Sequence, residues 1–171
     1  GGNGTYQNNT ISGNGQGIGV YYSSGNNPVF TGNNYTDNTS GNLVVSGTIS
    51  NAVSWLAARD NISLISNLTI AADGSLTIPS GSTLKVDYIT VNLNGALTIE
   101  SGVNVQLNNG AAIDVQGTLN ATNVRFTWAD GQNQWGGIRF YGSGASGSRL
   151  ENCTFEHASG WYYYGVIGIY D

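Results

Sequence analysis

Short segments of this 171-residue chain recur along the sequence at regular intervals. Residues 74–81 (GSLTIPSG) return one repeat later as residues 95–102 (GALTIESG), and residues 117–119 (GTL) follow at a similar interval. Residues 123–126 (NVRF) return, after a somewhat longer interval, as residues 152–155 (NCTF). Self-similarity at periods of roughly 20 to 50 residues is typical of solenoids, in which each repeat buries its apolar face against its neighbours. The repeats therefore predict a stack of similar coils.

Within the repeats, apolar and polar residues alternate over short stretches, as in residues 84–86 (LKV) and 113–115 (IDV). This alternation predicts short strands with one buried face, joined by turns rich in glycine and asparagine. The nearest approach to a helical pattern lies in residues 51–59, where we expect at most a short helical turn that packs Trp55 onto the core. Taken together, the pattern favours an all-β fold, a right-handed parallel β-helix of about seven to eight coils, each rising about 4.8 Å.

We expect a single β-helix unit over residues 1–171, with asparagine-rich coils in residues 1–50, a connecting segment in residues 51–67 and the remaining coils in residues 68–171. Cys153 falls on the repeat position of Val124 and should be a small, buried apolar residue. The rows of stacked residues that the repeats predict are Leu76 with Leu97 and Leu119, Phe126 with Phe155, and Asn9 with Asn33.

Composition narrows the classes of function. Charged residues make up only 9% of the chain and the net charge is −5, whereas an average soluble domain has roughly 25% charged residues. Because no basic run is present, nucleic acid is a poor candidate partner. A single cysteine excludes an internal disulfide, and no cysteine or histidine cluster has the spacing of a zinc site. We expect no metal, no cofactor and no membrane span, since no apolar stretch is long enough to cross a bilayer.

Several motifs follow one another in an order that resembles a known family. They are residues 45–49 (VSGTI), Trp55, residues 68–70 (LTI), 76–81 (LTIPSG), 117–121 (GTLNA), 135–140 (WGGIRF) and 150–155 (LENCTF). This order is similar to that of the right-handed parallel β-helix repeat modules of large prokaryotic surface and secreted proteins, within the pectate-lyase-like superfamily. The resemblance implies an extracellular or cell-surface location and a structural or adhesive role. It carries no catalytic residues with it.

The two ends of the sequence resemble each other. Residues 8–11 (NNTI) are similar to residues 152–155 (NCTF), and residues 18–21 (IGVY) to residues 167–170 (IGIY). Counted as though residue 1 followed residue 171, the intervals between these segments stay within the range of the internal repeats. We therefore expect one unit of a tandem or head-to-tail array, which forms a fibre, surface layer or adhesin from copies of itself. Because the sequence has neither an initiating methionine nor a secretion signal, we also expect it to be a mature or excised piece of a longer precursor. The residues predicted for the end-to-end interface are Ile11, Ile18, Val20, Ile167 and Ile169.

Some β-helix proteins cleave polysaccharides, which makes acidic residues candidates for catalysis. The chain has neither an Asp-Asp pair nor a Gly-His-Gly segment, the elements of polygalacturonase-like sites. Its only histidine, His157, follows Glu156, and the repeat places both over Thr127 and Trp128; a solvated charge pair is the favoured interpretation of Glu156. The pairs Asp87 with Asp114 and Asp73 with Glu100 are each separated by about one coil, and single solvated charges are favoured there too. We expect no catalytic residues.

A polysaccharide-binding or polysaccharide-cleaving module remains the alternative, because aromatic rings stack on sugars. The candidate carbohydrate contacts are Trp128, Trp161, Tyr162 and Tyr163. Asn-x-Ser/Thr sequons are frequent and are consistent with a glycosylated surface protein, although alternating turns and strands also favour these residue types. The candidate glycosylation sites are Asn3, Asn8, Asn34, Asn38, Asn61, Asn67, Asn120 and Asn152.

Overall fold

The structure is a computed structural model, and it describes residues 3–23, 26, 28–39, 41–54, 62–129, 131, 134–160 and 165–171. Nearly all of its regular structure is β-strand, and one short 3₁₀ turn, η2 (Ser143–Gly147), follows β15. The strands are β1 (Thr5–Gln7), β2 (Thr10–Ser12), β3 (Ile18–Tyr22), β4 (Val29–Thr31), β5 (Asn34–Thr36), β6 (Leu43–Ile49), β7 (Ala52–Ser54), β8 (Ile62–Ile70), β9 (Ser75–Ile78), β10 (Thr83–Val91), β11 (Ala96–Ile99), β12 (Asn104–Val115), β13 (Thr118–Thr122), β14 (Arg125–Trp128), β15 (Gly137–Tyr141), β16 (Arg149–Glu151), β17 (Thr154–Phe155) and β18 (Ile167–Tyr170).

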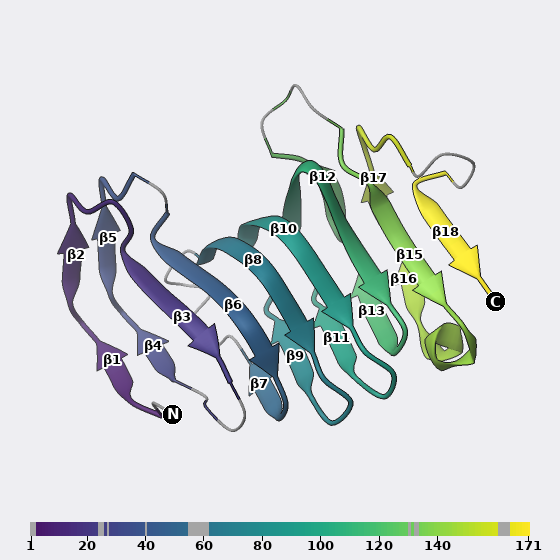
Figure 1. The fold of residues 1–171 in the computed structure, drawn as a ribbon. Helices are drawn as coiled ribbons and strands as arrows, with labels where there is room; N and C mark the ends of the chain where they lie inside the picture. Colours follow the sequence, from purple (N-terminus) through teal and green to yellow (C-terminus); the bar gives the residue numbers. More distant parts are fainter. Residues whose placement is uncertain are drawn as a thin grey trace.

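The strands form a parallel β-solenoid, as the sequence predicts. A large sheet has nine strands. Seven of them follow the order β17-β14-β12-β10-β8-β6-β3, and the other two branch from β12, because β15 pairs with β12 and β18 pairs with β15. A second sheet of five strands, in the order β16-β13-β11-β9-β7, lies behind it, and from β6 onward the strands of the two sheets follow one another along the chain (Figure 1). The first and last described strands therefore lie at opposite ends of the stack.

The solenoid has about five turns, fewer than the seven to eight coils predicted. The five-stranded sheet has one strand for each of these turns. The asparagine-rich N-terminal coils are built differently, because β1 pairs only with β4 and β2 only with β5, in two separate two-stranded sheets. These coils join the large sheet through β3 and β6.

The core is made of apolar side chains that stack in rows between the sheets. Leu97 lies between Leu76 and Leu119 in adjacent strands, and all three are buried. Phe126 pairs with Phe155, and their rings stack with centroids 5.1 Å apart. The predicted rows are confirmed, because side chains that alternate along a strand repeat at the same interval in the next coil. Cys153 packs against this core but is only half-buried, whereas the sequence predicted that it would be buried.

The turns bring neighbouring coils into close backbone contact. Gly117 begins such a coil, and a Cβ atom at this position would lie 2.2 Å from the carbonyl oxygen of Gly95. Only glycine fits there without displacing the coil below. The repeated glycine at the start of these coils is thus required by the stacking itself.

Two further expectations concern residues 51–67. We expected a short helical turn in residues 51–59, but Ala52–Ser54 form the strand β7 and are extended. The rest of the expected turn, including Trp55, lies outside the described residues. The strand β8 begins at Ile62, within the segment that we expected to be a connection. Among the described residues, no helix is long and apolar enough to cross a membrane.

Candidate functional site

The C-terminal end of the solenoid presents apolar side chains to solvent. The strand β18 pairs with β15, so that Ile167 lies beside Ile138 and Ile169 beside Phe140. Ile138 and Phe140 are 0% and 9% exposed, whereas Ile167 and Ile169 are 39% and 76% exposed. Ile167 and Ile169 therefore continue an interior row, and nothing in the described chain covers them.

A pocket of about 690 Å³ opens beside this uncovered row. It is bounded by the ends of β15 and β18 and by the segment that contains η2. Its apolar lining includes Phe140, Ala145, Leu150, Ile167 and Ile169. Among the described residues, the end of the core is thus open and hollowed.

The N-terminal end is similar in character. The ring of Tyr6 in β1 stacks on that of Phe30 in β4 with centroids 5.3 Å apart, but Tyr6 is 47% exposed while Phe30 is buried. A second pocket, of about 460 Å³, is lined by Tyr6, Ile18, Val20 and Phe30, among others. The predicted interface residues at this end are partly covered: Ile11 and Ile18 are half-buried, and Val20 is buried.

The backbone has the same sharp corners in the last coil and in the first two. Left-handed residues (positive φ) lie at Asn8 and Gly13 in the first coil and at the same spacing in the second, at Gly32 and Asp37. In the last coil they lie at Asn152 and His157, again with this spacing. Each first corner separates two short strands, β1 from β2, β4 from β5 and β16 from β17. The last coil is therefore shaped like the first along this part of its path.

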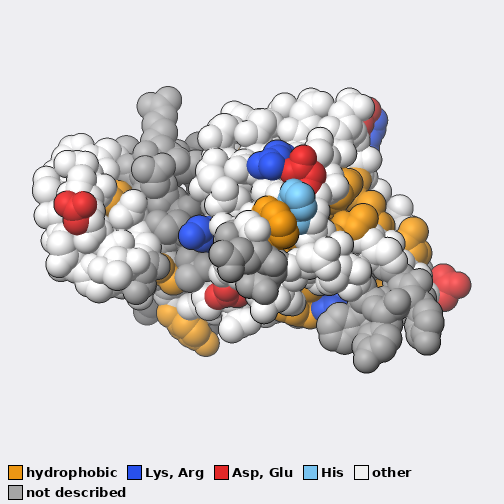
Figure 2. Space-filling model, turned by 90° about the horizontal axis from the view of Figure 1, so that it is seen from above, with side chains coloured by type: hydrophobic (Ala, Val, Ile, Leu, Met, Phe, Trp, Pro, Cys, Tyr) orange, Lys and Arg blue, Asp and Glu red, His pale blue; other side chains and the backbone are white. Residues whose placement is uncertain are grey.

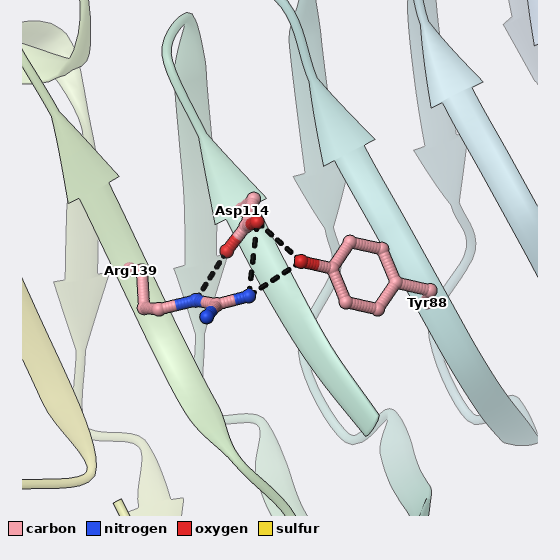
Figure 3. Close-up of polar contacts among 3 residues, drawn as sticks. All are labelled: Tyr88, Asp114 and Arg139. Carbon is pink, nitrogen blue, oxygen red and sulfur yellow. Dashed lines mark hydrogen bonds and ion pairs between the residues drawn. The ribbon is translucent and has the colours of Figure 1, made fainter. Parts of the chain in front are cut away.

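A polar cluster on the outer face of the large sheet links three strands (Figure 3). Arg139 of β15 donates from Nε to Asp114 Oδ1 of β12 at 2.5 Å and from Nη2 to Asp114 Oδ2 at 3.0 Å. The hydroxyl of Tyr88 in β10 donates to Asp114 Oδ2 and accepts from Arg139 Nη2. The side chains of Arg139 and Asp114 are only 12% and 20% exposed. Because both carboxylate oxygens accept hydrogen bonds from neighbouring strands, the cluster braces three strands together.

Burial raises the pKa of Tyr88 to about 12, and its hydrogen bond to Asp114 and the charge of that carboxylate act in the same direction. Burial and the charge of Asp114 also raise the pKa of Tyr141. Burial alone would lower the pKa of Arg139, but the hydrogen bond to Asp114, the charge of that carboxylate and the nearby Tyr88 and Tyr141 together outweigh burial and raise this pKa. The cluster therefore favours a neutral phenol beside a charged guanidinium.

We predict that Tyr88→Phe changes how stability depends on alkaline pH. The folded chain holds the Tyr88 proton more tightly than the unfolded chain, so this contribution to stability is complete below about pH 10 and is lost as the pH rises through about 12. The difference in free energy of unfolding between the wild type and Tyr88→Phe should shrink between about pH 9 and about pH 11.5, measured by urea unfolding. A difference that stays constant over this range would contradict the assignment.

Glu156 and His157 lie apart from this cluster. Glu156 forms an ion pair with Arg125 at 2.5 Å, and the ring of His157 stacks on Trp128 with centroids 3.9 Å apart. Figure 2 shows the histidine beside an acidic and a basic side chain on the face seen from above. Arg149 pairs instead with Glu151 at 3.0 Å. The predicted stacking of His157 on Trp128 of the preceding coil is confirmed. The carboxylate of Glu156 pairs with the guanidinium of Arg125.

Two pairs of acidic residues are separated by about one coil in the sequence, Asp87 with Asp114 and Asp73 with Glu100. Asp87, Asp114 and Glu100 each contact another group. Asp87 accepts a hydrogen bond from Asn108 Nδ2 at 2.5 Å, whereas Asp114 belongs to the cluster with Tyr88. Glu100 accepts from the backbone N–H of Ser80 at 3.0 Å. Within the described ranges, no group of three acidic, histidine or cysteine side chains is placed to hold a metal ion.

The candidate carbohydrate contacts are only partly described. Trp128 is half-buried, packs against the core and stacks on His157, so much of its ring already has a protein partner. Trp161, Tyr162 and Tyr163 lie outside the described residues. Further along the chain, Tyr170 of β18 stacks on Tyr141 of β15 with centroids 4.8 Å apart.

Most of the candidate glycosylation sites are accessible. Asn38 is half-buried, and its amide donates hydrogen bonds to Ile11 O and Asn42 Oδ1. Asn61 lies outside the described residues. The asparagines with exposed side chains are Asn3, Asn8, Asn34, Asn67, Asn120 and Asn152.

The chain matches no family model, no curated protein and no solved structure. The parallel β-solenoid is established by the strand pairing, while membership of the pectate-lyase-like superfamily stays a prediction from the order of the motifs.

Proposed function

We propose that this chain is a non-catalytic structural subunit or repeat that stacks head to tail with copies of itself. The observation that carries the proposal is the match between its two ends. The last coil has the corner spacing of the first, and β18 (IGIY) has the residue order of β3 (IGVY). A strand that pairs with β18 in the register of the solenoid would therefore place the same kinds of side chain over it.

In the proposed junction, β3 of one copy lies beside β18 of the preceding copy. Ile18 then covers Ile167, Val20 covers Ile169, and the two glycines between them face each other. Tyr21, which is 72% exposed, extends the stack of Tyr141 and Tyr170 on the outer face. Each of the four residues of β18 is thus continued by a residue of similar shape.

The energetics favour such a contact. An exposed apolar side chain of this size gains about 1.5 to 3 kcal/mol when it is buried, and the backbone groups of an edge strand gain hydrogen-bond partners. The strands β1, β2, β3, β17 and β18 contain no charged residue, and the two charges of β16 pair with each other. The strands that would meet at the junction therefore carry no unpaired charge. Because head-to-tail contacts of this kind do not close, they propagate as filaments.

We also propose an extracellular location, in a fibre, surface layer or adhesin. The low content of charged residues, the frequent sequons with exposed side chains and the resemblance of the motifs to prokaryotic surface proteins support it. Glycans at the exposed asparagines would add solubility that the sparse charges do not give.

The test is sedimentation velocity of the chain over a wide range of concentrations. We expect species that grow beyond dimers as the concentration rises, and filaments in electron micrographs. A single monomeric species at all concentrations would contradict the proposal. Saturable binding to a glycan array, or release of unsaturated sugars from uronate polymers, by that monomer would support the polysaccharide-directed alternative instead.

A further inference from the structure

Two asparagines of the second coil hold the backbone of the first. Asn33 Oδ1 accepts hydrogen bonds from the backbone N–H of Asn9 at 3.0 Å and from Asn9 Nδ2 at 2.9 Å, while Asn33 Nδ2 donates to Tyr6 O at 2.9 Å. Asn38 holds Asn14 and Ile11 in the same way. Each of these two side chains thus contacts two backbone groups of the preceding coil. One is the N–H of a given residue, and the other is the carbonyl oxygen of the residue three positions before that one.

Asn9 occupies the position of Asn33 one coil earlier. It follows the left-handed Asn8 as Asn33 follows the left-handed Gly32, and the strands that they precede, β2 and β5, are paired in the same register. Their environments differ, because Asn33 is 8% exposed whereas Asn9 is exposed to solvent. Asn9 is therefore the equivalent of a buried, coil-joining amide at a position where the described chain supplies no preceding coil.

The last coil offers the matching backbone. Cys153 follows the left-handed Asn152, as Asn9 follows Asn8, and Leu150 lies three residues before Cys153. On the basis of the proposed function, we infer that Asn9 joins two copies: its Oδ1 accepts from the N–H of Cys153 and its Nδ2 donates to the carbonyl oxygen of Leu150 in the preceding copy. The partner that Asn9 recognises is thus the C-terminal coil of a second copy of this chain.

This contact gives the stack its direction and register. Apolar rows alone tolerate a reversed or slipped contact, since burial of apolar surface has no preferred direction. Asn9 Nδ2 keeps its hydrogen bond to Asn33 Oδ1 in any arrangement, but a slipped or reversed contact would remove Asn9 Oδ1 from water without a donor, which is unfavourable. Only the head-to-tail arrangement in the solenoid register gives Asn9 both partners.

The experiment compares Asn9→Ala with Asn34→Ala by sedimentation velocity. Asn34 is exposed on the neighbouring strand β5, so its variant is the matched control. We expect Asn9→Ala to raise the dissociation constant of assembly about 5- to 100-fold and Asn34→Ala to leave it unchanged. Asn9→Asp keeps an acceptor for the Cys153 N–H but places a carboxylate oxygen against two acceptors, Asn33 Oδ1 and the Leu150 carbonyl, so it should weaken assembly at least as much as Asn9→Ala. It also tests the inference if Asn9→Ala does not fold.

The outcomes separate this inference from the proposed function. If the wild type assembles and all three variants assemble equally well, the role of Asn9 is overturned and the stacking function stands. If the wild type does not assemble at all, the proposed function and the inference fail together.

Discussion

The variant Ile169→Asp is expected to remain monomeric at concentrations at which the wild-type chain assembles. Ile169 is 76% exposed on its own, yet it lies in an interior row directly beside the buried Phe140. In the stacked form, a carboxylate at this position would be buried among apolar side chains without a partner, which is strongly unfavourable. Sedimentation velocity over a concentration series measures the loss.

Leu93→Asp provides the matched control for this variant. Leu93 is also exposed, at 53%, but it lies in the turn between β10 and β11, where its side chain is next to Gly144 of η2, and it is not part of the interior row that ends at Ile169. The two substitutions make the same change of size and charge. We expect Leu93→Asp to assemble like the wild type, and equal assembly of both variants would show that β18 is not the contact.

The variant Leu97→Ala is expected to lower the free energy of unfolding by about 2 to 5 kcal/mol. Leu97 is fully buried between Leu76 and Leu119, so truncation leaves a cavity in the row that holds three turns together. In a solenoid without disulfides, such rows supply most of the cohesion between coils. Urea unfolding of the variant measures the change.

Thr98→Val is the control for Leu97→Ala, because Thr98 is the next residue of β11 and is half-buried on the outer face. It should alter the free energy of unfolding by less than about 0.5 kcal/mol. An unchanged midpoint for Leu97→Ala would mean that the interior row is assigned to the wrong residues.

The register of the solenoid could be predicted from the sequence because its determinants are local. Each strand alternates inward and outward residues, each turn has glycine or asparagine, and the interval between repeats then fixes which residues stack. Leu97 on Leu76 and Ile167 beside Ile138 follow from these rules alone. The number of turns was predicted less well, since the intervals do not show that β1 and β2 form small sheets of their own with β4 and β5.

The cluster of Tyr88, Asp114 and Arg139 was not found from the sequence, and the reason is a bulge. The pairing of β10 with β12 shifts its register between Val86, which lies beside Leu107, and Tyr88, which lies beside Ala112. Asp114 consequently lies beside Thr90, with the hydroxyl of Tyr88 within reach, and not beside Asp87 as the coil interval suggested. Gly110, which has a positive φ in the middle of β12, is the signal that marks this shift.

The helical turn expected in residues 51–59 was based on the spacing of Val53, Leu56 and Ala57. This window is too short to distinguish the apolar period of a helix from that of a strand. Neighbouring strands decided the conformation of its first part, because Val53 of β7 pairs with Leu76 of β9 and enters the leucine row. Tertiary packing thus overrode a weak local preference.

Disulfide cross-linking between the two ends tests the stacking most directly. Tyr21 and Tyr170 both lie on the outer face, and in the proposed junction their strands are about 4.8 Å apart, within the range that a disulfide spans. The variant Tyr21→Cys, Tyr170→Cys, made with Cys153→Ser, should form a ladder of covalent multimers on a non-reducing gel after mild oxidation. Variants with only one of the two new cysteines should give dimers at most. Absence of multimers larger than dimers from the double variant, at concentrations that saturate assembly, would contradict head-to-tail stacking.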